Sequence, residues 1–330
     1  MHGARIYRPR ACHGALFPLQ TDQLHCYGAD GARMPCAGSG QDAARDKAHV
    51  HRDRFQVRGE TVLDTLSGAL WTLDANPAGF PLTWKEAGDH VLAMASRVEH
   101  GQRNWQLPPR RLLFSLLSHQ TVHPALPQGH PFRNVFSGYY WTADACHRIP
   151  DQVWHVHLGG ARVARANRQD AALVWPVCLP DCPPPWPPGT PDGAASPETG
   201  GERFVAREGW ALDTLTGLGW ALDAAPAGHA LAWREALDFV NGWNSRGEWG
   251  ASDWRVPDIR ELESLIDLAE DSPALPGGHP FRQVRDVYWS STTSVYETRY
   301  AWALYMQDGM VGVGFKPDAG FHVWPVRDAR

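Results

Sequence analysis

The sequence has no long apolar run, no excess of basic residues and few methionines. None of its 330 residues lies in an apolar stretch near the roughly 18–20 residues that cross a membrane, so we expect no membrane span. Lys and Arg total 31 against 36 Asp and Glu, a net charge of −5, which disfavours nucleic-acid binding. The chain has 16 Trp beside 5 Met, with 32 Gly and 27 Pro. This composition favours turns, short strands and aromatic cores over a helical bundle.

Six cysteines are present, and two of them flank a turn-rich stretch. Cys26 and Cys36 bracket CYGADGARMPC, in which Gly and Asp favour a tight reversal. We therefore predict a hairpin-closing disulfide between them, provided that the compartment is oxidising. Cys146 has two candidate partners, Cys178 and Cys182, and the sequence leaves that choice open.

The same region offers weak signals for metal binding. Cys178 and Cys182 form a C-x3-C pair, and alternation along WHVHL places His155 and His157 on one strand face. Two histidines on a solvated strand face are the commoner explanation, so we predict no metal site and no cofactor. The first residues, MHGARIYRPRACHGALF, contain no 7–15-residue apolar core, so no signal peptide is visible in this chain.

An internal repeat organises the chain. LDTLSGALW at residues 63–71 returns as LDTLTGLGW at residues 212–220, an offset of 149. The same offset relates further matches: Trp84 to Trp233, Trp105 to Trp254, Pro108 to Pro257, PALP at 124–127 to 273–276, GHPF at 129–132 to 278–281, and WPV at 175–177 to 324–326. A register held across the whole copy predicts two domains of one fold.

The repeat sets the expected domain boundaries. We predict an irregular lead-in over 1–53, a first domain over 54–178 and a second over 203–330. The Pro-rich residues 179–202 form an interdomain linker. We expect the lead-in to pack against the first domain.

Each copy is expected to contain a short strand, then two helices, then further strands. Short strands are expected over Phe55–Leu63 and Phe204–Ala211, and helical spacing begins at Trp84 and Trp233. Thr83 with Glu86 makes a capping box for the first of these helices. After Pro257, Asp258 caps a second helix whose apolar side extends to Ala269, and Glu261 stands three residues after the cap. The last third of each copy consists of strands joined by turns, including Asp308–Gly309. The predicted class is α+β, with two helices and a meandering antiparallel sheet in each domain.

Several ordered motifs in the second copy resemble those of a known family. SDWRVPDIRELESLID, PALPGGHPF, YWSSTT and VWPVRD, in this order, resemble the Lcl C-terminal domain family of collagen-like bacterial adhesins. The resemblance covers nearly all of residues 203–328. It is partial over 54–178, where YWTADA and WQLPPRRLLFSLL stand instead, so the first copy is divergent.

The resemblance implies tandem C-type-lectin-like domains on a secreted, periplasmic or cell-surface protein. A collagen-like member implies binding to sulfated glycosaminoglycans. This chain departs from that member, because it has no Gly-X-Y repeats and a negative net charge. Arg282, Arg285 and Arg299 are scattered along the second copy, so we do not carry the polyanion ligand over.

Most conspicuous residues of the second copy suit a structural role. We expect six tryptophans to form the core: Trp220, Trp233, Trp254, Trp289, Trp302 and Trp324. Glu261, Glu263 and Asp267 suggest a carboxylate site, but Glu263 and Asp267 stand four residues apart on what we expect to be a solvated helix face, so we do not predict catalysis there. No histidine motif supports the hydroxyl cluster at Ser290 as a nucleophile, so we predict no catalytic residues and no enzyme.

The remaining candidates are side chains of the terminal strands, which we expect to be exposed. The predicted ligand-binding residues are Tyr296, Tyr300, Tyr305, Gln307, Asp308 and Lys316. They favour a non-enzymatic binding or adhesion module for a glycan or protein ligand, without nucleic acid as a partner. The alternative is a structural subunit of a surface or periplasmic assembly, whose Trp-rich faces bury against partner subunits.

Overall fold

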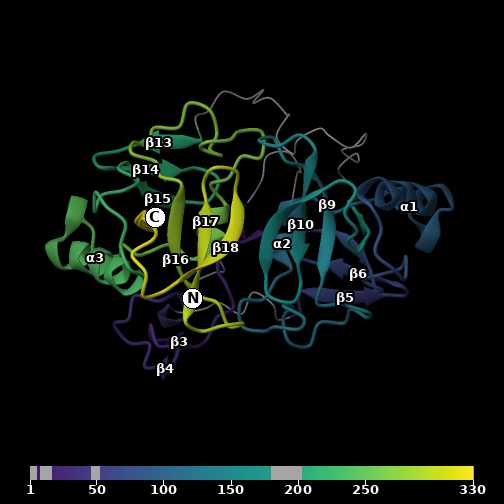
Figure 1. Cartoon of the computed structure of the whole chain (residues 1–330), viewed down its shortest axis with the longest axis horizontal. Coiled ribbons are helices and arrows are strands. Elements are labelled where there is room, and N and C mark those ends of the chain that lie inside the picture. The colour runs from purple at the N-terminus through teal and green to yellow at the C-terminus, as the bar shows by residue number, and fades with distance from the viewer. Residues whose placement is uncertain (1–5, 8–16, 46–52, 180–202, 330) are drawn as a thin grey trace. The chain divides into compact units, whose positions relative to one another are not determined.

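The chain forms two compact units of similar construction. The computed structural model describes residues 6–7, 17–45, 53–179 and 203–329 (Figure 1). One unit contains the first domain, and the other joins the second domain to residues 18–45 of the lead-in. Both are mixed α/β, with mostly antiparallel strands and few helices. The predicted linker falls almost entirely outside the described residues.

The first domain has a five-stranded sheet, in the order β5-β6-β7-β12-β8, and a three-stranded antiparallel meander, β9-β10-β11. Its elements are β5 (Phe55–Arg58), β6 (Thr61–Asp64), β7 (Leu70–Thr72), α1 (Trp84–Ser96), the 3-10 helix η2 (Glu99–Gly101), β8 (Trp105–Gln106), α2 (Arg110–Ser115), β9 (Tyr139–Ala145), β10 (Gln152–His157), β11 (Arg162–Asn167) and β12 (Val177–Cys178).

The second domain repeats this plan, with a sheet β13-β14-β15-β19 and a meander β16-β17-β18 (Figure 1). Its elements are β13 (Phe204–Ala206), β14 (Trp210–Asp213), β15 (Leu218–Ala221), α3 (Trp233–Arg246), η3 (Glu248–Gly250), α4 (Ile259–Glu263), β16 (Val287–Thr293), β17 (Tyr300–Tyr305), β18 (Met310–Phe315) and β19 (Val326–Asp328). Ahead of both domains lie β1 (Ile6–Tyr7), β2 (Phe17–Pro18), β3 (Cys26–Tyr27), β4 (Arg33–Met34) and η1 (Asp42–Ala44).

The opening of each domain differs from the expected single strand. Residues 55–64 form a hairpin of β5 and β6, and residues 204–213 form the matching hairpin of β13 and β14. Gly59 and Gly209 turn these hairpins with φ of +63° and +75°. Glycine adopts such angles at no steric cost, so each glycine ends one strand where alternation alone suggested a continuous one.

Capping explains where the helices begin. Thr83 and Glu86 make the predicted capping box of α1, and Asp258 and Glu261 make that of α4. In the described structure of α2, Pro109 gives no side-chain cap. The helix α4 ends at Glu263, before the predicted Ala269, because Leu265 N–H and Ile266 N–H donate to carbonyls three residues back and close a tight turn.

Tryptophan side chains hold both domains together in the same way. Trp84 Nε1 donates to Thr142 O at 2.9 Å, and Trp233 Nε1 donates to Ser290 O at 2.7 Å. Three more pairs follow this pattern, each from an indole to a backbone carbonyl: Trp141 and Trp289 to Leu82 and Leu231, Trp105 and Trp254 to Glu99 and Glu248, Trp175 and Trp324 to Thr72 and Ala221. The repeat therefore preserves hydrogen bonds as well as residue types.

The six tryptophans expected in the second core are all buried, and none is more than 3% exposed. Trp289 lies near Gly314 of β18 and Phe321, whose ring centroid is 4.5 Å from its own. A Cβ atom on Gly314 would lie 2.3 Å from Phe321 and 2.4 Å from Trp289. The aromatic core thus requires glycine at this strand position.

We expect Gly314→Ala to destabilise the second domain by about 1–3 kcal/mol, because the added methyl overpacks the core. The control is Gly320→Ala, since a Cβ at Gly320 meets no atom within 4 Å. Urea unfolding of the full chain, with amide exchange of β17 and β18 to localise the effect, measures the difference. Equal stability of the two variants would contradict this account of the core.

Candidate functional site

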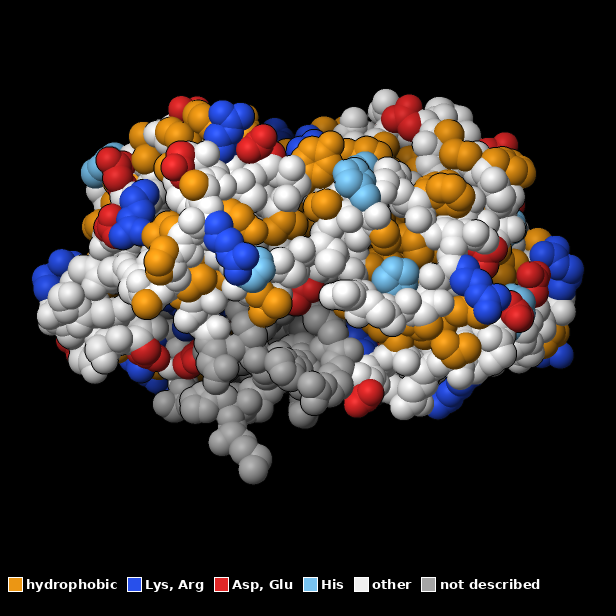
Figure 2. Space-filling view, turned by 90° about the horizontal axis from the view of Figure 1, so that it is seen from below, with side chains coloured by type: hydrophobic (Ala, Val, Ile, Leu, Met, Phe, Trp, Pro, Cys, Tyr) orange, Lys and Arg blue, Asp and Glu red, His pale blue; other side chains and the backbone are white. Residues whose placement is uncertain are grey.

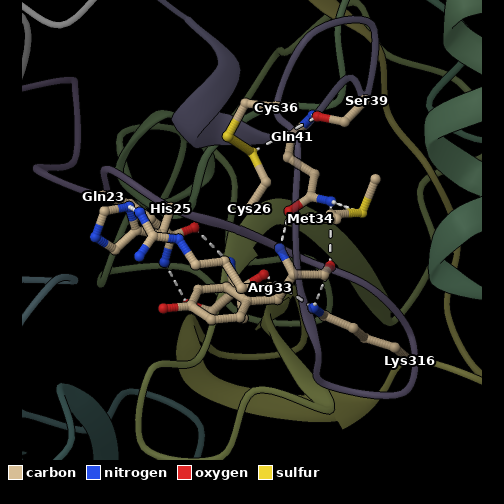
Figure 3. The surroundings of a disulfide bond; sticks show 11 residues. Gln23, His25, Cys26, Arg33, Met34, Cys36, Ser39, Gln41 and Lys316 are labelled. Carbon is tan, nitrogen blue, oxygen red and sulfur yellow. Dashed lines mark hydrogen bonds between the residues drawn. A yellow bond between two sulfur atoms is a disulfide. The ribbon is translucent and has the colours of Figure 1, made fainter.

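The lead-in begins with a small disulfide-closed hairpin. Strands β3 and β4 pair antiparallel, and Cys26 and Cys36 form the predicted disulfide, with their Cα atoms 5.3 Å apart. Gln41 reaches back to this hairpin: its Oε1 accepts from Tyr27 N–H at 3.0 Å, and its Nε2 donates to Tyr27 O at 3.1 Å (Figure 3). Figure 3 shows that the disulfide and Gln41 brace the hairpin while Lys316 approaches it from the second domain.

The described lead-in packs against the second domain, so our expectation that it packs on the first domain is wrong. The side-chain amide of Gln23 makes two hydrogen bonds to the backbone of Thr293, the last residue of β16. Its Nε2 donates to Thr293 O at 2.7 Å, and its Oε1 accepts from Thr293 N–H at 2.9 Å. The Thr298 hydroxyl donates to Gly31 O at 2.8 Å. The lead-in hairpin and β16 are therefore bonded across about 270 residues of sequence.

A charge cluster anchors the end of the lead-in. Arg45 donates to Asp42 at 3.1 Å, to Glu261 at 3.0 Å, and also to Asp258. Asp42 accepts a further hydrogen bond from Thr292 at 2.9 Å. Burial alone lowers the pKa of Arg45, but the carboxylates of Glu261, Asp258 and Asp42 outweigh it and raise that pKa above its ordinary value. Arg45 therefore stays charged and ties the lead-in to α4.

These anchors change the interpretation of the α4 carboxylates. Glu263 is 4% exposed, so the predicted solvated helix face is wrong at that residue, and Glu261 is also buried, at 0%. Sequence reasoning took Asp258 as a helix cap and missed that it and Glu261 also bind Arg45. A signal was available, because the first copy has Pro109 and Leu112 at these two positions. The first domain thus lacks both carboxylates that bind Arg45, and the lead-in is held by the second domain, which has them.

Lys316 follows β18 and is completely buried beneath the lead-in. Its Nζ donates to Tyr27 O at 3.1 Å, to Gly28 O at 3.3 Å and to Thr293 Oγ1 at 3.0 Å. It also lies 4.1 Å from the centre of the Trp233 ring. Burial lowers the pKa of Lys316 to about 7, with Asp30 acting in the opposite direction. The side chain thus holds the lead-in hairpin in place.

The structure separates the six predicted ligand-binding residues into different environments. Lys316 and Asp308 are 0% and 5% exposed, so the expectation that they are exposed is wrong. Tyr296 and Tyr300 lie at one end of β17, and Tyr305 and Gln307 at the other. Tyr300 and Tyr305 are also an odd number of residues apart on one strand, so they point to opposite faces of the sheet. The six do not form one surface.

The loop 294–299, between β16 and β17, presents the most exposed of these residues. Tyr296 is 63% exposed. Ser294 N–H donates to Tyr300 O at 2.9 Å, and Tyr300 N–H donates to Glu297 O at 2.9 Å. Together with the bond from Thr298 to the lead-in, these contacts fix the loop at both ends. The loop 294–299 is the strongest candidate surface for binding.

The polar residues of the first domain are largely taken up in packing. His155 is 8% exposed and stacks on Tyr139, with ring centroids 3.9 Å apart. Cys146 and Cys178 are buried free thiols, so they do not pair with each other; Cys182 lies outside the described residues. No cluster of three or more metal-ligating side chains occurs within the described ranges. In the same part of the chain, no helix is long and apolar enough to cross a membrane.

Two copies of one mixed α/β domain, the second bound by a disulfide-closed segment, define a tandem-domain protein, and the disulfide is consistent with an oxidising compartment. The model of the Lcl C-terminal domain matches residues 60–178 and 209–327, so the chain belongs to that family, in two tandem copies. This family is associated with adhesins and surface proteins. Searches of curated proteins and of solved structures returned no match.

We expect Lys316→Met to loosen the lead-in without unfolding the second domain. The variant keeps the length of the side chain but loses the hydrogen bonds to Tyr27 and Gly28, and bonds from charged donors contribute about 1.5–3 kcal/mol. Amide exchange over residues 26–42 should accelerate at least about tenfold. Lys85→Met, at an exposed lysine of α1, is the control. Unchanged protection in Lys316→Met would refute the anchoring role.

His155 predicts an acid sensitivity of the first domain. Burial, and then the nearby His157, lower the pKa of His155 to about 4. In the unfolded chain His155 takes up a proton near pH 6.5, whereas in the folded domain it stays neutral down to about pH 4. The stability of the folded domain therefore falls as the pH drops from about 6.5 to about 4. The loss is at most about 3 kcal/mol. His155→Gln should flatten this dependence in urea unfolding at pH 7 and pH 5, and the exposed His147→Gln should not.

Proposed function

We propose that the chain is a non-enzymatic recognition module of an exported or surface protein, and that its second domain binds a glycan or protein ligand through the loop 294–299. We further propose that each domain has a C-type-lectin-like fold. Family membership supports the first proposal. The order of elements supports the second, because each domain combines two α-helices with a meandering antiparallel sheet.

The exposure of Tyr296 on a fixed loop carries the proposal. Tyr296 exposes most of a large aromatic side chain to water, and tyrosine supplies contact area with little loss of conformational entropy. Here the loop is held by hydrogen bonds to β17 and to the lead-in, so little ordering is needed when a ligand binds. Arg299 and Glu297, which pair at 3.4 Å, add exposed charges of both signs beside the ring.

The hydroxyl cluster of β16 supports the absence of catalysis. Ser290 Oγ donates to Trp302 O at 2.8 Å, Ser291 Oγ donates to Pro257 O at 3.2 Å, and Thr292 Oγ1 donates to Asp42. All three hydroxyls are buried and occupied by structural hydrogen bonds. A serine nucleophile needs an adjacent base, and these groups face backbone carbonyls or a carboxylate that already binds Arg45.

A structural subunit of a surface or periplasmic assembly is the second candidate. Two phenylalanines of the first domain favour it, because Phe80 and Phe136 are 61% and 52% exposed. Aromatic residues are enriched in the cores of interfaces between proteins.

The test compares the full chain with Tyr296→Ala on a glycan array and in a pull-down from surface extract. We expect Tyr296→Ala to weaken ligand binding at least about tenfold, as loss of an aromatic hot spot does. Phe80→Ala is the matched control, since it removes an equally exposed ring from the first domain. Wild-type binding by Tyr296→Ala would exclude the loop. A stoichiometric protein partner lost in Phe80→Ala would favour the assembly subunit.

A further inference from the structure

Backbone hydrogen bonds bring three loops of the second domain together at the start of β16. Leu231 N–H donates to Phe321 O at 2.9 Å, and His322 N–H donates to Val287 O at 3.1 Å. These bonds place the loop before α3, the loop before β16 and the loop before β19 side by side. The loops carry His229, Arg285 and His322, of which His229 and Arg285 are exposed and His322 is half-buried.

The three side chains are close enough to influence one another. Burial lowers the pKa of His322, and the positive charges of Arg285 and His229 lower it further, while Asp286 acts in the opposite direction. Arg285 donates to Gln283 Oε1 at 3.3 Å, and Gln283 in turn donates to Asp223 at 3.0 Å. Within the described residues, Arg285 forms no ion pair with a carboxylate. The cluster therefore combines one arginine and two histidines, with Asp286 and Asp223 as the neighbouring acids.

The first domain shows that the fold does not need these charges. The same backbone bonds recur there: Leu82 N–H donates to Ala172 O at 2.9 Å, and Leu173 N–H donates to Tyr139 O at 2.8 Å. The residues that match His229, Arg285 and His322 are apolar, namely Phe80, Phe136 and Leu173.

The match between Phe136 and Arg285 is fixed by an equivalent contact. Phe136 N–H donates to the hydroxyl of Tyr140 at 2.9 Å, and Arg285 N–H donates to the hydroxyl of Tyr288 at 2.6 Å. One scaffold thus carries an apolar trio in one domain and a cationic trio in the other. The scaffold itself therefore does not account for the arginine and the two histidines of the second domain, since it accepts apolar residues at all three positions.

We propose that His229, Arg285 and His322 form a binding site for one anionic oxygen group, a carboxylate or a phosphate, and that it binds this group more tightly in acid than at neutral pH. Guanidinium and imidazolium groups donate charge-assisted hydrogen bonds to such oxygens. Histidine gains its charge as the pH falls, so the positive charge of the site grows in acid.

This site is separate from the loop 294–299. Arg285 precedes β16 and the loop 294–299 follows it, so the seven residues of β16 lie between them, a span of roughly 20 Å. Tyr305 lies opposite Val287 at the same end as the cationic trio, and its ring is 6.1 Å from that of Phe321. An aromatic surface therefore adjoins the anion site. On the face shown in Figure 2, basic side chains are interspersed with acidic and apolar ones, and no extended basic field is visible there.

The test follows histidine ring resonances of the full chain by NMR during titration with inorganic phosphate or acetate, at constant ionic strength set by chloride. At pH 5.5 we expect saturable shifts of His229 and His322 with either anion. Acetate is ionised at both pH values, whereas phosphate gains a second negative charge, so the pH comparison uses acetate, which should bind at least about tenfold more weakly at pH 8. By linkage, the bound anion must also raise the pKa of His322. The anion that binds more tightly identifies the ligand class as phosphate or carboxylate.

Arg285→Phe introduces the residue of the first domain at the matched position, so the variant is expected to fold and to lose saturable binding at least about tenfold. Arg282→Gln removes an exposed arginine of the same loop and should bind as the original chain does. The proposal is overturned by absence of saturation at pH 5.5, by equal binding of chloride, by uniform shifts of all histidines, or by unchanged binding in Arg285→Phe.

Discussion

Four indole hydrogen bonds, repeated in the two domains, constrain the whole architecture. A tryptophan that fills a core also buries an N–H group, and an unsatisfied donor costs roughly 1–3 kcal/mol. In each domain four indoles meet this requirement by donating to a backbone carbonyl of another segment, and the four carbonyls are equivalent in the two copies. Trp233 thereby joins α3 to β16, and Trp289 joins β16 to the loop before α3. These buried hydrogen bonds fix the helices, loops and sheet of each domain relative to one another without a contribution from surface residues.

Because that interior is shared, the two domains can differ at their surfaces. The anchors Asp258 and Glu261 of the second domain are Pro109 and Leu112 in the first, and the lead-in is bound where the carboxylates remain. Lys316 and Arg168 occupy equivalent positions of the two domains and differ in residue type but not in sign of charge. Both place a cation over the first tryptophan of a helix, at 4.1 Å from Trp233 and 4.6 Å from Trp84. The cation–π contact belongs to the fold, whereas the hydrogen bonds from Lys316 to the lead-in belong to the second domain alone among the described contacts.

Local chemistry made much of this structure predictable from the sequence. The starts of α1 and α4, the disulfide between Cys26 and Cys36, and the aromatic core all depend on residues that are close in sequence or repeated at a fixed offset. The environment of Lys316 depends on carbonyls 288 and 289 residues away in the sequence. The spacing of apolar residues along one strand or helix gives no information about such distant contacts. The candidate binding residues around β17 are close in sequence, so the sequence predicts that they form one surface. They lie at opposite ends of the strand, because a strand of six residues separates them in space.

The position of the lead-in has a consequence for biosynthesis. The hairpin emerges from the ribosome before either domain, yet its docking site includes Lys316, which is made about 270 residues after Arg45. At 5–20 residues per second this delay is on the order of 15–50 s. During that time the disulfide, which spans only 10 residues, can close without any other part of the protein. The second domain therefore receives a segment made before the first domain, and its packing can be complete only after Lys316 has been made.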